Sequence, residues 1–126
     1  MNQVDYLDLE DLLYLAGELL GYPPPVREAG LLGAAVARPR TTVFGDDAYP
    51  GIWTKAAALL QSIVKGHPLV DGNKRLGWLA TATFLEINGI EMTRIPNEDI
   101  YRFVTGVAAR NYDADRLAAE LKRLNR

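Results

Sequence analysis

The chain has 126 residues and a formal net charge of −2, with 48% hydrophobic and 24% charged residues. This length and composition predict one globular domain, residues 1–126, that buries a core without disulfides. The sequence contains no cysteine, which excludes thiolate metal sites, and its charge gives no general basic field for nucleic acid. The N-terminus does not resemble a signal peptide, and no apolar run reaches the roughly 20 residues of a membrane span. We therefore expect a cytoplasmic protein with no membrane contact and no direct nucleic acid binding.

Helical periodicity marks the first part of the chain. Apolar residues recur at helical spacing from Leu9 to Leu20, with Asp8 as a candidate N-cap and Gly21 as a candidate terminator. The prolines at 23–25 predict an extended connection, and a second helix is expected over about 26–37.

A strand-like stretch follows this second helix. It begins with β-branched residues, continues with Gly-Asp turn chemistry and closes at Pro50. We interpret residues 41–49 as an irregular loop or short β-hairpin. The hairpin begins with Thr41, Thr42, Val43 and Phe44.

The helical pattern returns over residues 52–65, with Gly66 as the expected terminator, and again from residue 76 to a stop at Asn88-Gly89. Residues 56–64 and 76–85 carry no charge, which predicts that these two helices form the buried centre. Two further amphipathic helices are expected near the C-terminus, one capped by Asn97 and one following Asp113. The chain is thus predicted to be all-α and compact, with about six helices and one short hairpin.

The residues with the clearest chemistry lie between the two uncharged helices, in the run Gly66-His67-Pro68-Leu69-Val70-Asp71-Gly72-Asn73-Lys74-Arg75. His67 is the only histidine and is a candidate general base toward a hydroxyl. Asp71 is a candidate Mg²⁺ ligand, because Mg²⁺ binds one or two carboxylates together with phosphate oxygens.

The same run is expected to open the next helix through the turn at residues 71–73. A helix N-terminus presents unpaired N–H groups and a partial positive charge, which bind anions, and Gly72 allows a close backbone approach. Lys74 and Arg75 in the first turn oppose the helix dipole, so their presence indicates that an anion binds there. The combination predicts chemistry on a phosphorylated ligand.

Each residue alone has an ordinary explanation. A single histidine after a helix is usually a polar loop residue, Asp71 would be an N-cap, and Gly72-Asn73 would be a turn. Lys74 and Arg75 would form a solvated face. These separate explanations give no reason for two cations at a helix N-terminus beside the only histidine, and the combination therefore favours a site.

The run from His67 to Arg75 resembles the signature of the Fic/Doc superfamily in its Doc version. The resemblance extends to Gly30-Leu31-Leu32, Ala37-Arg38-Pro39, Tyr49-Pro50, Lys55-Ala56-Ala57 and Asn88-Gly89. It implies the all-α Fic fold. Fic enzymes transfer AMP from ATP to target hydroxyls, using a Gly-Asn-Gly-Arg anion hole and a second Arg three positions on.

This sequence departs from that pattern at two positions. Lys74 stands where the second Gly would be, and Trp78 stands where the second Arg would be. Both departures match Doc toxins, and this resemblance implies a protein kinase in which ATP lies inverted, with the γ-phosphate presented. Leu69 replaces the usual Phe and is expected to anchor the loop on the core.

The resemblance implies specific roles. His67 would deprotonate a Ser or Thr hydroxyl, Asp71 would hold Mg²⁺, and the amides of Gly72, Asn73 and Lys74 would cradle the phosphates of ATP. The side chains of Lys74 and Arg75 would offset developing charge. The 41–49 hairpin would be the flap that docks the target segment. The implied target is elongation factor Tu, whose phosphorylation arrests translation.

Regulation and alternatives also follow from the sequence. No Glu has Ser or Thr four residues before it, so the inhibitory helix of many Fic enzymes is not expected. Restraint would come from a Phd-like antitoxin whose disordered tail folds on binding. The alternatives are AMP transfer, or a catalytically degenerate module that binds an antitoxin and tunes operon repression. Helix-turn-helix DNA binding is disfavoured by the negative charge and the uncharged central helices.

Overall fold

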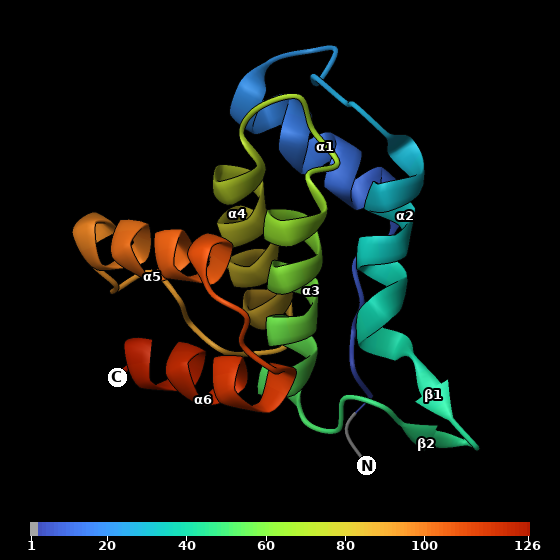
Figure 1. The fold of residues 1–126 in the computed structure, drawn as a ribbon, viewed down its shortest axis with the longest axis vertical. Helices are drawn as coiled ribbons and strands as arrows, with labels where there is room; N and C mark the ends of the chain where they lie inside the picture. Colours follow the sequence, from blue (N-terminus) through green and yellow to red (C-terminus); the bar gives the residue numbers. More distant parts are fainter. Residues whose placement is uncertain (1–2) are drawn as a thin grey trace.

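The computed structural model describes residues 3–126, which form six α-helices, one 3₁₀-helix and one β-hairpin (Figure 1). In chain order these are α1 (Leu9–Leu20), α2 (Ala29–Ala37), η1 (Arg38–Arg40), β1 (Thr42–Val43), β2 (Asp46–Asp47), α3 (Ile52–Gly66), α4 (Asn73–Ile87), α5 (Asn97–Ala109) and α6 (Ala114–Leu124). The predicted all-α class, the six helices and the hairpin are confirmed. Within these residues, no helix is both long and apolar enough to cross a bilayer.

Helix α3 lies at the centre of the fold and packs along α4, with α2 on one side and α5 and α6 on the other (Figure 1). Its residues 56–60 are at most 1% exposed. Close packing with α4 depends on Gly77, where an added Cβ would lie 2.7 Å from Cγ2 of Val64. The prediction that the two uncharged helices form the buried centre is confirmed.

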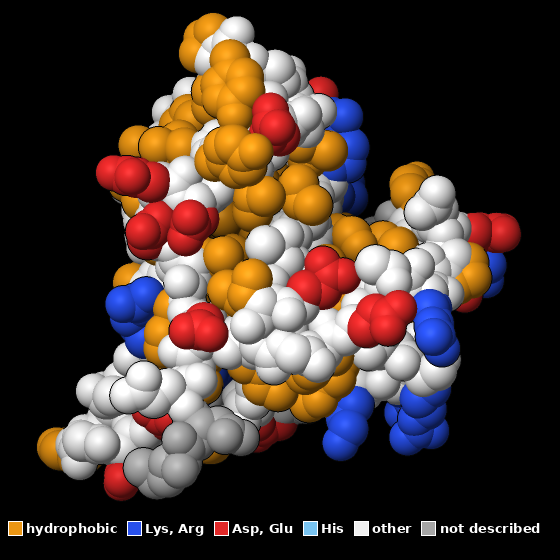
Figure 2. Space-filling model, turned by 180° about the vertical axis from the view of Figure 1, so that it is seen from behind, with side chains coloured by type: hydrophobic (Ala, Val, Ile, Leu, Met, Phe, Trp, Pro, Cys, Tyr) orange, Lys and Arg blue, Asp and Glu red, His pale blue; other side chains and the backbone are white. Residues whose placement is uncertain are grey.

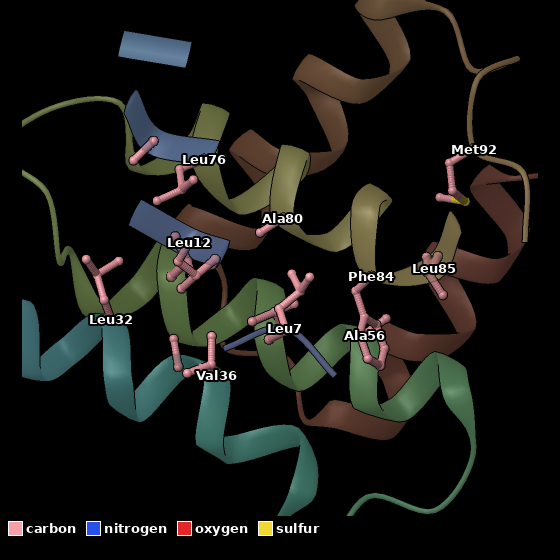
Figure 3. Packing of buried hydrophobic residues seen from close by; sticks show 14 of the residues in the cluster. Leu7, Leu12, Leu32, Val36, Ala56, Leu76, Ala80, Phe84, Leu85 and Met92 are labelled. Carbon is pink, nitrogen blue, oxygen red and sulfur yellow. The ribbon is translucent and has the colours of Figure 1, made fainter. Parts of the chain in front are cut away.

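Side chains from five helices, α1 to α4 and α6, meet in the main core cluster. Figure 3 shows α4 residues facing residues of α1, α2 and α3, among them Leu12, Leu32, Val36, Ala56, Leu76, Ala80 and Phe84. A second cluster joins α3 to α5 and α6. The two helices that flank the loop between α3 and α4 both pack in the core. The core therefore holds the loop at both ends.

Helix α1 begins and ends where its sequence predicts. The Asp8 carboxylate accepts from the Asp11 N–H at 2.8 Å, and the Asp11 carboxylate accepts from the Asp8 N–H at 2.9 Å. Such reciprocal capping stabilises a helix by about 1 kcal/mol. Gly21 ends the helix with a φ of 100°, a conformation that favours glycine.

Two expected helix boundaries are wrong for a tertiary reason. Helix α2 begins at Ala29 rather than near Val26, because residues 25–28 pair with the loop after α3. Helix α3 continues through Gly66, and His67 instead takes the left-handed conformation that was expected of a terminating glycine. Both differences arise at the contact between these two segments.

The expected cap of α5 is also wrong. Asn97 is the first helical residue, and Pro96 occupies the N-cap position with no side-chain hydrogen bond. Proline fixes φ near the value of −60° found here and has no N–H to satisfy, so it can precede a helix without a capping side chain.

Candidate active site

The candidate site is the loop that joins the end of α3 to the start of α4. His67 leaves α3 with φ 53° and ψ 56°, a left-handed conformation that is uncommon outside glycine. The Arg27 guanidinium supports it: Nε donates to the His67 carbonyl at 2.8 Å, and Nη2 donates to the Gly66 carbonyl at 3.2 Å. A cation at the C-terminus of α3 also interacts favourably with the helix dipole.

The segment before α2 clamps this loop through its backbone. The N–H groups of Arg27 and Glu28 both donate to the Pro68 carbonyl, at 2.8 and 3.0 Å, and the Val70 N–H donates to the Pro25 carbonyl at 2.8 Å. Leu69 lies inside this antiparallel pairing and is 1% exposed, which confirms it as the expected apolar anchor.

The Asn73 side chain holds the loop from the other side. Its Oδ1 accepts from the Leu69 N–H at 2.9 Å, its Nδ2 donates to the Leu69 carbonyl at 3.1 Å, and Nδ2 also lies 3.3 Å from His67 Nδ1. Asn73 is itself buried. One amide therefore fixes both the anchor residue and the candidate base.

Gly72 precedes the first residue of α4 and has a φ of 89°. A Cβ here would lie 2.7 Å from Cδ1 of Leu20 and 3.4 Å from Nη2 of Arg75, so both the conformation and the space require glycine. Asp71 is not the N-cap: Gly72 holds that position and makes no side-chain cap. The N–H groups of residues 73–75 have no acceptor within residues 3–126, and they remain available to a ligand.

The charged side chains of the loop are exposed. Arg75 Nη2 lies 3.9 Å from the Asp71 carboxylate, an exposed pair of the kind that contributes little to stability. Lys74 is exposed, in the first turn of α4, and makes no ion pair within residues 3–126. Two cations thus lie at the positive end of the α4 dipole, which is electrostatically unfavourable. A bound anion would offset this repulsion.

All the residues that the sequence assigns to phosphate chemistry line one cleft of about 790 Å³. Its polar part is formed by His67, Asp71, Gly72, Asn73, Lys74 and Arg75. Its apolar wall comes from α4 and α5 and includes Leu79, Ile100, Val104 and Ala108. Trp78 also lines the cleft and packs edge-on against Phe103, with ring centroids 6.3 Å apart.

Asp71 is the one carboxylate that lines this cleft, and its side chain is 89% exposed. Residues 3–126 contain no group of three His, Cys, Asp or Glu side chains that would hold a metal alone. This donor set fits Mg²⁺, which is commonly bound by one or two carboxylates together with the phosphate oxygens of a substrate.

The predicted flap residues are not part of the cleft. Thr41, Thr42, Val43 and Phe44 belong to the hairpin that precedes α3, whereas the His67 loop follows α3. Figure 1 shows the hairpin and the loop at opposite ends of this helix. Fifteen helical residues span about 22 Å, so the structure does not bring the hairpin to His67.

Three supporting residues were missed by the sequence reasoning. Arg27 and Pro25 act on the loop from about 40 positions earlier in the chain, and Leu20 closes over Gly72. Nothing local to these residues indicates such contacts. The one relevant signal is that the helical pattern is lost after the prolines at 23–25. The backbone groups of the following residues are therefore free to pair with the loop after α3.

The fold and the site define an all-α protein whose candidate active-site loop joins its two central helices. The Fic/DOC family model matches residues 6–85. The chain is also 51% identical over 120 residues to a protein named toxin Doc from Mycolicibacterium smegmatis, which covers 93% of this chain and 91% of that protein. The chain belongs to the Fic/DOC family.

Proposed function

We propose that this protein is the toxin of a toxin–antitoxin system and that it transfers the γ-phosphate of ATP to a Ser or Thr hydroxyl of elongation factor Tu, arresting translation. One observation carries the proposal: His67, Asp71 and the first turn of α4 line a single cleft. The relative named toxin Doc supports the toxin role.

The phosphates are bound by the start of α4. The free N–H groups of residues 73–75 and the side chains of Lys74 and Arg75 surround the position where an anion meets the helix dipole. These donors are fixed before the substrate arrives, because Gly72 and Asn73 lock the turn. Fixed donors stabilise the charge that develops during transfer without reorganising.

The transfer itself needs one proton acceptor. The target hydroxyl oxygen forms a bond to the γ-phosphorus, the bond from that phosphorus to the bridging oxygen breaks, and ADP leaves. The hydroxyl proton goes to the His67 ring. Bound Mg²⁺ would neutralise phosphate charge, and Asp71 is the residue that would hold it.

The choice of phosphate depends on the cations of the cleft. Lys74 and Arg75 are the only Lys or Arg residues of 3–126 that line it, and the apolar ring of Trp78 occupies the wall one turn beyond them. A second guanidinium, which would clamp the α- and β-phosphates for AMP transfer, is replaced by this ring. This favours the γ-phosphate, and AMP transfer is the alternative.

A double-label assay tests the choice. The protein is incubated with Mg²⁺, elongation factor Tu and ATP labelled at the α- or the γ-position in separate reactions. We expect label on the target only from γ-labelled ATP. Transfer of the α-label alone would replace the kinase proposal by AMP transfer.

His67→Ala tests the base. Removing a general base slows transfer by about 10²–10⁴-fold. The His67 side chain is exposed, so circular dichroism and thermal unfolding should remain close to those of the wild type. An unchanged transfer rate would remove His67 from the mechanism.

The proposed partner that restrains the toxin is a Phd-like antitoxin with a disordered tail. The surface offers exposed apolar side chains on and after α1, among them Leu9, Tyr14 and Tyr22. Figure 2 shows hydrophobic and acidic side chains gathered over this upper part of the molecule. Co-expression with such an antitoxin should restore growth. If the antitoxin binds but the isolated chain neither transfers label nor arrests growth, the degenerate-module alternative holds.

A further inference from the structure

The orientation of the Asn73 amide is set by the backbone of Leu69. The Leu69 N–H can only donate, so the atom 2.9 Å from it is the amide oxygen, Oδ1. The Leu69 carbonyl can only accept, so the atom 3.1 Å from it is the amide nitrogen, Nδ2. Reversing the amide would place donor against donor and acceptor against acceptor in a buried position.

The same amide nitrogen also contacts the His67 ring. Nδ2 lies 3.3 Å from Nδ1 of His67 and carries hydrogens but no lone pair to offer. The contact is a hydrogen bond only when Nδ1 presents its lone pair. In a neutral imidazole with a free Nδ1 lone pair, the proton is on Nε2.

We propose that Asn73 holds His67 in the Nε2–H tautomer in the substrate-free protein, so that the ring nitrogen left for a substrate donates a hydrogen bond and cannot accept a proton. For the mechanism, this inference rests on the proposed function. His67 becomes a base only after its contact with Asn73 breaks and the ring turns or moves its proton to Nδ1. Asn73 is therefore a positioning residue that delays base formation until substrate binds.

The chain offers an unusually direct test, because His67 is its only histidine. Labelling histidine rings with ¹⁵N gives a single pair of nitrogen signals. At alkaline pH, where imidazoles are neutral, we expect a pyridine-type signal from Nδ1 and a pyrrole-type signal from Nε2. In uniformly labelled protein we also expect a scalar coupling across the hydrogen bond between Asn73 Nδ2 and His67 Nδ1. A pyrrole-type signal at Nδ1, or no coupling, would overturn the inference.

Asn73→Asp provides the reciprocal variant. A carboxylate oxygen in place of Nδ2 can only accept a hydrogen bond, here from Nδ1–H of the ring, so the Nδ1–H tautomer should become dominant. Asn97→Asp is the matched control, since it adds the same charge to the cleft wall from a residue with no hydrogen bond to His67. It should retain the wild-type tautomer. If Asn73→Asp folds and keeps Nε2–H, the inference fails; if it does not fold, the wild-type coupling decides alone.

The proposed tautomer and the proposed activity are tested by independent measurements, and either can be wrong without the other. The spectrum is recorded without ATP or target, and the label assay is run without reference to the tautomer. Nδ1–H in a protein that transfers the γ-label would overturn this inference and leave the proposed function standing. Nε2–H with the Asn73 coupling in a protein that transfers no label would support the tautomer and count against the kinase.

Discussion

A non-helical segment adjoins each end of α3, and the two segments are held in opposite ways. The loop after α3 is tied by the backbone of residues 25–28, by Arg27 and by Asn73. The hairpin before α3 has two-residue strands, and all of its residues from Thr42 to Asp47 are exposed. One end is built around fixed side chains, and the other projects from the surface.

Each segment contains one non-glycine residue with a strained backbone, so the two segments can be compared directly. His67 with φ 53° and Phe44 with φ 52° are the only non-glycine residues within 3–126 that have positive φ. This conformation costs roughly 1–2 kcal/mol. At His67 the tertiary clamp opposes the strain, whereas Phe44 is fully exposed and only the tight turn holds it. The strained backbone at His67 is held by residues outside its own loop, whereas that at Phe44 is not. Such external support is typical of a site that needs fixed geometry.

The largest expected difference between the two ends is in the loss of stability when Gly72 or Gly45 is replaced by alanine. Their φ values are 89° and 85°, but a Cβ at Gly72 meets Leu20 while a Cβ at Gly45 meets nothing within 4 Å. We expect Gly45→Ala to lower the free energy of unfolding by roughly 1–2 kcal/mol and Gly72→Ala by roughly 2–5 kcal/mol. Chemical denaturation measures both. Equal losses would show that Leu20 moves aside without cost.

Arg27→Ala should lower both the stability of the protein and the rate of transfer. The variant removes two hydrogen bonds to the carbonyls of Gly66 and His67, at a cost of about 1–3 kcal/mol. Freed from this support, His67 loses its fixed position, and the turnover of γ-label should fall about tenfold or more. Arg40→Ala is the control and should leave turnover unchanged, because Arg40 is exposed, lies directly before the hairpin and stacks over the Tyr6 ring, away from the cleft. If both variants transfer label at the wild-type rate, the clamp has no catalytic role.

The contrast also explains what the sequence could predict. Helical periodicity located the six helices, and the lack of charge in two of them identified the centre. The site residues follow one another in the chain, and their position at the start of α4 follows from a turn and a helix signal. The clamp joins residues about 40 positions apart, and neither Arg27 nor Pro25 carries a local signal for it. The left-handed His67 follows from that clamp, and for this reason Gly66 was wrongly expected to end α3.

Lys55→Met should loosen the hairpin end of α3. Lys55 is 2% exposed, and its ammonium lies 3.2 Å from both the Asp47 carboxylate and the Pro39 carbonyl. Met fills a similar volume, and the Asp47 carboxylate stays hydrated because its side chain is 51% exposed. The Pro39 carbonyl loses its buried donor, so the free energy of unfolding should fall by about 1–3 kcal/mol. Hydrogen exchange at the Ala48 N–H, which bonds to Thr41, should become faster. Unchanged exchange would mean that the ion pair does not hold the hairpin.

Phe44→Asn tests whether the free end takes part in target recognition. Positive φ at both Phe44 and Gly45 defines a two-residue hairpin turn that prefers Asn at its first position, so the hairpin should gain about 0.5 kcal/mol. The hairpin is about one helix length from His67, a distance that a protein target can span. If the exposed ring docks that target, KM for elongation factor Tu should rise severalfold while kcat stays constant. An unchanged KM would restrict target recognition to the His67 end of α3.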